Sequence, residues 1–238
     1  MPPIEPDAAP EFQDLPSTFS WEQCAEVCAQ FRRAAEAQGM PCELDRERGA
    51  FLSGFWSCTP PLVFPIPEDC LDLPYYVQTL PLEPGRQVLV LLQAGAAALG
   101  YFEYGEEIRT KAIKRYVVRG SGKAQSTHLK TKGKSRYGSR LRLQNAKAIL
   151  EEVNERLVDW WNEHGAPEAV FHNAPVRLWA DLCRAKPAPP FLTEDHVASD
   201  EPVPQIRIPL DLPVPTTDVM LRTYRSLSHG RIARGPLS

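Results

Sequence analysis

Residues Gln87–Gln93 read QVLVLLQ and residues Ala97–Tyr104 read AALGYFEY, and these two runs are the strongest evidence in the sequence for its fold. The first is a continuous apolar run of strand length, which predicts a strand buried on both faces. The second follows a small-residue turn, and Gly105-Glu106 then turns the chain into a third run, Ile108–Val118. Together the three runs predict a β-meander that opens the main domain.

A long amphipathic helix is expected after this meander. Ser139 is expected to cap the helix, and Gly165 is expected to end it. The apolar residues between them repeat at spacings of three and four, which predicts one buried stripe along the helix. At least one of the two adjacent tryptophans is expected in the core. The stripe consists of Leu143, Ala146, Leu150, Val153, Leu157 and Trp160, and Trp161 is the tryptophan next to it.

Shorter runs after this helix alternate between the patterns of strands and helices. Strands followed by alternating helices and strands predict an α/β (α+β) fold, with a mixed β-sheet covered by helices. The expected elements are strands at Glu168–His172 and Gln205–Pro209 and helices at Val176–Arg184 and Asp218–Leu227.

A small α+β unit is expected before the main domain. Ser20 and Gln23 match a capping box, and apolar residues at helical spacing continue to a stop at Gly39. Residues 41–56 predict a hairpin that turns near Gly49, and a Pro-rich stretch from Thr59 to Pro84 reads as a linker. The expected boundaries are a disordered tail at 1–17, the small unit and its linker at 18–84, the main domain at 85–230, and a tail at 231–238.

The charge distribution is strongly uneven. From Ile108 to Leu150 the chain carries thirteen Lys or Arg residues and no Asp or Glu, whereas the other 195 residues carry 14 basic and 30 acidic residues. An acid-free segment in a chain that is acidic elsewhere indicates a surface for a polyanion. We therefore expect nucleic acid as a partner.

Composition argues against several other classes of protein. No apolar run reaches the roughly 18–20 residues of a membrane span, and the acidic, Pro-rich N-terminus lacks the order of a signal peptide. We therefore expect a cytoplasmic protein. The six cysteines form no CxxC pair, which argues against a zinc site, and we expect Cys24 and Cys28 to be small core residues. No metal and no cofactor are expected.

A polar, basic loop is expected at 119–139, between the third strand and the long helix. Its length would let the tip stand about 30 Å from the domain. The segment Gly120–Ser126 lacks the full P-loop signature, because Val117 and Ala124 occupy two of its positions, and it also lacks a third Gly in dinucleotide-binding register. It has no carboxylates for a metal-dependent nuclease. A flexible basic tether, with Gln125 incidental, stays open on these grounds.

Three motifs in order connect this segment to a known family. They are Arg115-Tyr116-x-Val118-Arg119, the loop sequence Gly122-Lys123-Ala124-Gln125, and Gly138-Ser139-x-Leu141-Arg142-x-x-Asn145 at the start of the long helix. The run from Val88 to Leu157 thereby resembles the Vms-like release factor family, whose bacterial peptidyl-tRNA hydrolases are related to the catalytic domain of eukaryotic translation termination factors. The similarity extends over residues 86–228, and the N-terminal helix and hairpin resemble the accessory unit of bacterial members.

This resemblance implies an RNase H-like catalytic domain and release of nascent chains from stalled large ribosomal subunits. By the same resemblance, Gln125 would position the water that attacks the peptidyl-tRNA ester, with the small neighbours Gly122 and Ala124 letting the backbone approach. Two residues depart from the Gly-Gly-Gln motif of termination factors: Ala124 precedes the Gln, and Lys123 replaces a Gly. His128 is a weaker candidate for a base.

Two further sets of residues are expected to support the loop. Residues expected to contact RNA phosphates are Arg115, Arg119, Lys123, Lys130, Lys132, Lys134, Arg136, Arg140 and Arg142. Residues expected to anchor the loop are Tyr116, Gly138, Ser139 and Asn145, while Tyr137 either stacks on a base or packs at the helix entry.

The expected partners are the large ribosomal subunit, its rRNA and peptidyl-tRNA. No membrane is expected as a partner, and the protein is expected to be monomeric. Two alternatives stay open from the sequence: an RNA-binding rescue factor without chemistry, and cleavage of tRNA near its acceptor end. Recruitment would rest on the main domain, the small unit or the basic C-terminal residues Arg231 and Arg234.

Overall fold

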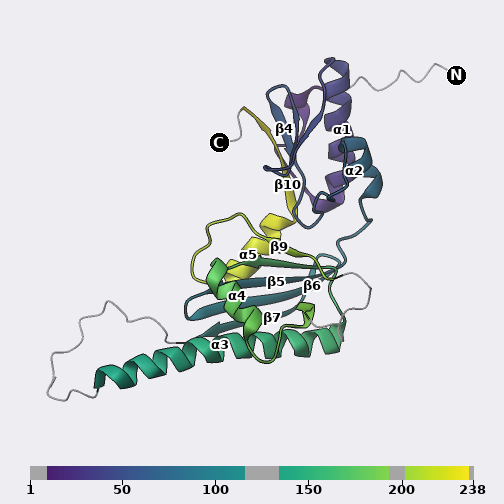
Figure 1. The fold of residues 1–238 in the computed structure, drawn as a ribbon. Coiled ribbons are helices and arrows are strands. Elements are labelled where there is room, and N and C mark those ends of the chain that lie inside the picture. The colour runs from purple at the N-terminus through teal and green to yellow at the C-terminus, as the bar shows by residue number, and fades with distance from the viewer. Residues whose placement is uncertain (1–9, 116–133, 193–201, 236–238) are drawn as a thin grey trace. The chain divides into compact units, whose positions relative to one another are not determined.

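A computed structural model describes residues 10–115, 134–192 and 202–235, with residues 134–139 described by their backbone alone. The chain divides into two compact units. The small unit comprises Met1–Pro84 together with Thr223–Ser238, and the large unit comprises Gly85–Arg222. Each unit has its own five-stranded sheet (Figure 1).

The large unit is built on a mixed sheet in the order β7-β6-β5-β8-β9. The first three strands along the chain form an antiparallel meander, whereas β8 runs parallel to β5, and β9 runs parallel to β8. Numbered along this unit, the order is 3-2-1-4-5, that of an RNase H-like sheet. The predicted α+β class is confirmed. The strands are β5 (Arg86–Gln93), β6 (Ala96–Glu103), β7 (Glu106–Lys114), β8 (Ala169–Asn173) and β9 (Gln205–Arg207).

The central strand β5 is buried on both faces, as its uninterrupted apolar run predicts. Helix α3 (Lys134–His164) and helix α4 (Val176–Arg184) pack on one face, where Val90 of β5 joins the apolar core beneath α3. On the other face, the bare Cα of Gly100 in β6 makes room for Met220 of α5 (Thr217–Leu227). A Cβ there would lie 2.5 Å from the Met220 sulfur. The sheet is thus covered on both faces (Figure 1).

Helix α3 starts earlier than the sequence predicted. It begins at Lys134, so Gly138 and Ser139 lie within the helix, and Ser139 is not its N-cap. A glycine inside a helix costs only about 1 kcal/mol relative to alanine, which is small enough for the flanking residues to continue the helix. The expected loop at 119–139 is correspondingly shorter. Residues 116–133 lie outside the described part of the chain.

The apolar stripe of α3 is also shorter than predicted. Leu150, Val153, Leu157 and both tryptophans are buried, so the core prediction for Trp160 or Trp161 is confirmed. Leu143, however, is 73% exposed, and the buried residues of α3 begin at Ile149. The reason is geometric, because a 31-residue helix is about 45 Å long and its first half extends beyond the sheet in Figure 1.

The small unit has an antiparallel sheet in the order β1-β10-β4-β3-β2. The predicted hairpin is present, since β2 pairs with β3 around a turn that contains Gly49 at φ +59°. Cys24, Cys28 and Phe31 of α1 are fully buried, so the two cysteines are core residues as predicted. The elements are β1 (Thr18–Ser20), α1 (Cys24–Ala37), β2 (Glu43–Asp45), β3 (Ala50–Ser53), β4 (Trp56–Thr59), α2 (Leu73–Thr79) and β10 (His229–Arg234).

Three expectations about the ends and linker of the small unit are wrong. The chain at 231–238 is not simply a tail, because β10 is inserted between β1 and β4. The expected tail at 1–17 includes Phe12, which is buried and stacks on Trp56 with ring centroids 5.5 Å apart. The linker from Thr59 to Pro84 contains α2, whose Leu73 and Tyr76 are buried. In each case tertiary burial overrides a local pattern rich in proline or polar residues.

Candidate nucleic-acid interface

The structure describes the two ends of the basic loop and not its tip. Strand β7 ends at Lys114 and helix α3 begins at Lys134, so both ends belong to the large unit. The predicted catalytic residues lie outside the described part of the chain, as do several predicted RNA-binding and anchoring residues. These are Gly122, Ala124 and Gln125, together with Tyr116, Arg119, Lys123, Lys130 and Lys132.

Arg115 joins the end of β7 to helix α3. Its backbone N–H donates to the carbonyl of Gly95, 2.9 Å away, which holds the chain beside the β5–β6 turn. Its guanidinium Nη2 lies 2.6 Å from Oε2 of Glu152 on α3, with the two side chains 37% and 27% exposed. The Nε atom is buried and has no hydrogen-bond partner among the described residues. Arg115 therefore already has an anchoring partner, and its predicted contact with RNA stays a prediction.

Arg109 makes a second link between β7 and α3. Its Nη2 atom is 2.7 Å from Oε1 of Glu163, and this hydrogen bond lowers the pKa of the Glu163 carboxyl. Arg109 and Arg115 thus hold the edge strand to the helix at positions six residues apart. Both cations face carboxylates of α3, so they are less available to an external phosphate than an unpaired cation is.

The lysines between these arginines have no such partner. Lys111 and Lys114 are exposed, and neither forms an ion pair with a described residue. Because β7 is an end strand of the sheet, only β6 borders it within the sheet. Sequence reasoning did not place Lys111 or Lys114 among the RNA-binding candidates, although both lie in the acid-free segment. Lys111 and Lys114 could have been identified from their position on an edge strand that leads into the loop.

The first half of α3 continues the same basic surface. Arg140 is exposed and Arg142 is half-buried, and neither forms an ion pair with a described residue. Lys147 is paired with Glu151 at 3.1 Å, one turn further along. Lys134, Arg136, Gly138 and Ser139 all lie in the first turns of the helix, and the predicted anchor Asn145 is half-buried.

The cations near the loop therefore form two groups. Lys111, Lys114, Arg140 and Arg142, here called the open cations, have no ion pair with any described residue and lie on the two elements that lead into and out of the loop. Arg109, Arg115 and Lys147 are paired with carboxylates of α3. Open cations on a surface contribute affinity for phosphates, which depends on salt.

His172 is a buried ionisable group in the large unit's sheet that the sequence did not predict. It lies in β8 and stacks on Trp179 of α4, with ring centroids 3.9 Å apart and planes 7° from parallel. Burial, and then the positive charge of Arg207, lowers the pKa of His172 to about 4. A neutral histidine that stacks on Trp179 contributes to the packing of β8 against α4.

Within residues 10–115, 134–192 and 202–235, no group of three His, Cys, Asp or Glu side chains is arranged to hold a metal ion. No helix in the same ranges is long and apolar enough to cross a membrane.

Comparison with known proteins identifies the family to which most of the chain is similar. The family model described as "bVLRF1: Bacteroidetes VLRF1 release factor" matches residues 87–234, more than half of the 238-residue chain. A solved structure titled "Vms1 mitochondrial localization core" is similar at 12% sequence identity with a TM-score of 0.45, and the match covers 94% of this chain and 93% of that chain. No curated protein matches the chain.

Proposed function

The chain belongs to the Bacteroidetes VLRF1 release factor family, and from this premise we propose that it hydrolyses peptidyl-tRNA on stalled large ribosomal subunits. A role in translational release or rescue follows from the family itself. The hydrolysis, the substrate and the residues that act are the proposal.

The observation that carries the proposal is the arrangement of charge where the loop begins and ends. The four open cations lie on β7 and on the first half of α3, so phosphates could be contacted on both sides of the loop. The carboxylates of α3 begin only at Glu151, in the half of the helix that covers the core. A surface of this kind suits a loop that enters a space walled by RNA.

In the proposed reaction, Gln125 at the loop tip positions one water molecule through its backbone and side-chain amide. The water oxygen attacks the carbonyl carbon of the ester and loses a proton to solvent or RNA. The bond from that carbon to the tRNA oxygen breaks, and this oxygen takes up a proton. The products are an intact tRNA and a peptide with a free carboxylic acid, which then loses its proton to solvent. Orientation of water and hydrogen bonds to the developing oxyanion lower the barrier by several kcal/mol.

The neighbours of Gln125 have supporting roles in this proposal. Small residues at Gly122 and Ala124 let the backbone approach the ester, and Lys123 adds a cation near the surrounding RNA. The basic residues of the loop and of the helix start contact phosphates. Arg115 and Glu152 fix the base of the loop, since their ion pair joins the two elements between which the loop extends. The protein acts in the cytoplasm as a monomer, and its partners are the large subunit, its rRNA and peptidyl-tRNA.

The test uses purified large subunits that carry peptidyl-tRNA, with label on both the peptide and the tRNA. Incubation with the full chain is expected to free the peptide and leave the tRNA at its original length. Salt-sensitive binding without peptide release would contradict the proposal and would show that the protein is a binding factor that catalyses no hydrolysis. A shortened tRNA would also contradict the proposal, because it would show that the protein cleaves the RNA near its acceptor end. The two labels separate these outcomes in one experiment.

A further inference from the structure

A groove runs along the outer edge of the small unit's sheet, beside β2. This strand is at the end of the sheet and pairs with β3 alone. Among the described residues, no backbone group outside the sheet makes a hydrogen bond to the backbone of Glu43, Leu44 or Asp45. Successive residues of a strand turn their N–H and C=O groups to opposite edges. Either Leu44 or its two neighbours therefore present unpaired backbone groups to the groove, and such groups can pair with an added strand.

The lining of the groove comes from both faces of the sheet at this edge. Leu52 lies directly opposite Glu43 in the register, whereas Leu44 lies opposite Phe51 and so belongs to the other face. Leu71, which is 80% exposed, and Cys70 lie across from the strand. An added strand would thus find apolar side chains on either side of its backbone, which is the arrangement that strand addition uses.

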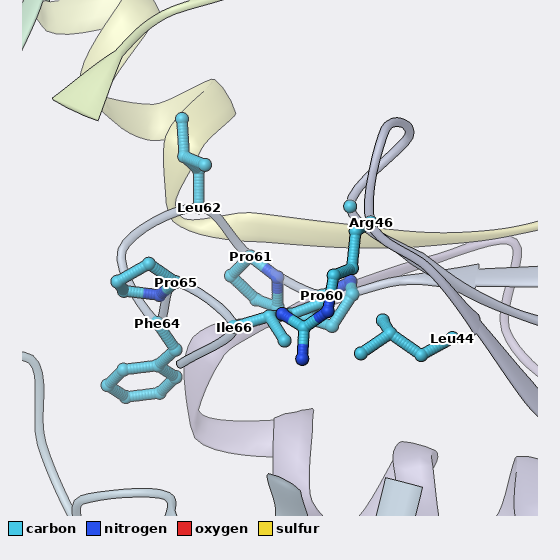
Figure 2. A pocket seen from close by; sticks show the side chains of 9 residues that line it. Leu44, Arg46, Pro60, Pro61, Leu62, Phe64, Pro65 and Ile66 are labelled. Atoms are coloured by element: carbon cyan, nitrogen blue, oxygen red, sulfur yellow. The ribbon is translucent and has the colours of Figure 1, made fainter. Parts of the chain in front are cut away.

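A half-open cavity of about 220 Å³ shares lining residues with this groove. Leu44 and Arg46 belong to both, and the cavity is otherwise walled by Pro60, Phe64 and Ile66 among other residues (Figure 2). Its volume is below the roughly 300–1,000 Å³ of small-molecule sites and well above the about 30 Å³ of one water. A single large apolar side chain suits it better than a cofactor does.

The charge at the groove favours a basic occupant. Arg46 is held by the backbone, because its guanidinium donates to the carbonyl oxygens of Pro67 and Cys70. Asp45 is paired with Arg48, at 3.6 Å. Glu43 and Glu47 are exposed and form no ion pair with any described residue. Two open carboxylates beside the edge strand attract Lys or Arg and repel the phosphates of RNA.

From the edge strand, the cavity and the two carboxylates, we propose that the β2 edge binds an extended basic polypeptide segment of a partner protein. The segment adds a strand to the sheet and places one apolar side chain in the cavity. Its Lys or Arg residues lie beside Glu43 and Glu47. This surface belongs to the small unit, so it is separate from the loop and does not depend on the hydrolysis proposed above.

The test measures binding of the full chain to a synthetic peptide of sequence Lys-Val-Lys-Leu-Lys-Val-Lys by fluorescence anisotropy at low salt. The double variant Glu43→Lys with Glu47→Lys is expected to weaken this binding on the order of tenfold. The matched control is Glu22→Lys with Glu83→Lys, which reverses two exposed carboxylates elsewhere in the same unit. The control should bind the peptide within about twofold of the unmodified chain.

Hydrogen exchange on the same complex tests the strand addition itself. Amide protection is expected to rise within Glu43–Asp45 when the peptide is bound. Equal affinity of the Glu43/Glu47 variant and its control would overturn the proposal. So would equal binding of a peptide with Glu in place of each Lys, or unchanged exchange at β2. Peptide release from large subunits should be the same in both variants if the proposed hydrolysis is correct, so the two proposals fail separately.

Discussion

The two halves of helix α3 differ in charge, burial and partners. Residues 134–148 include five basic residues and no acid, and no side chain that the structure describes there is buried. Residues 149–164 hold all five carboxylates of the helix and its whole buried stripe. One continuous helix thus has a half that holds the domain together and a half that is free to meet a partner. The apolar residues of α3 therefore serve the core, whereas its basic residues are placed where a partner can reach them.

A substitution in the buried half of α3 should cost the most stability. Leu157 is fully buried in the core of the large unit, so Leu157→Ala should lower the free energy of unfolding by about 3–4 kcal/mol. Leu143→Ala is the matched change in the exposed half and should cost less than about 0.5 kcal/mol. Urea unfolding of both variants makes the measurement. Similar losses for the two would show that the exposed half is packed as well.

The core beneath the buried half should also make stability depend on pH. His172 stacks on Trp179, which packs against that core, and its pKa is about 4 in the folded state against 6.5 in the unfolded state. The unfolded state therefore binds a proton more readily, and stability falls as the pH is lowered from about 6.5 towards 4. The loss should approach about 3 kcal/mol at the low end.

The check is a series of urea unfolding curves across that pH range. His172→Phe keeps an aromatic ring for Trp179 and removes the titrating group, so the part of the pH dependence due to His172 should disappear. A variant whose stability follows pH as steeply as the unmodified chain would contradict the assigned pKa.

In the exposed half, the expected effect is on binding. Arg140→Ala with Arg142→Ala removes two open cations and should weaken binding to large ribosomal subunits about tenfold. The slope of log affinity against log salt should fall by about two. Arg177→Ala with Arg184→Ala removes two exposed arginines from α4 of the same unit and serves as the control. Equal effects of the two pairs would mean that net charge matters and the position of the charges does not.

The ion pair between Arg115, at the base of the loop, and Glu152, in the buried half of α3, should contribute little to stability. A double-mutant cycle of Arg115→Ala and Glu152→Gln should give a coupling of less than about 1 kcal/mol in stability, because both side chains are partly exposed. Each single variant should release peptide more slowly than so small a loss of stability would explain, because the Arg115–Glu152 pair positions the loop. Single variants with normal release would leave the pair a purely structural link.

The contrast within α3 also shows how far the sequence could predict the molecule. The run QVLVLLQ is apolar at every interior position, so the buried strand β5 could be predicted directly, and the resemblance to Vms-like release factors is confirmed by the family match. The periodic stripe of α3 predicted the helix but included Leu143, because periodicity does not show where the sheet beneath a helix ends.

Other features depended on contacts between distant parts of the chain. Strand β10 lies more than 160 residues along the chain from β4, its neighbour in the sheet. No local sequence pattern near Arg231 predicts that the two strands pair. The separation of open cations from paired ones likewise depended on Glu152 and Glu163, which face β7 only in the folded unit. The tip residues predicted from the motif, Gln125 above all, stay predictions.

The role of Gln125 in hydrolysis is tested by a single-turnover measurement with Gln125→Ala on large subunits that carry labelled peptidyl-tRNA. Peptide release and subunit binding are followed in the same preparation, with Ser126→Ala as the neighbouring control. We expect Gln125→Ala to slow release by at least about 100-fold and to leave binding within about twofold, while Ser126→Ala keeps most of the activity. Release by Gln125→Ala at the rate of the unmodified chain would contradict that role.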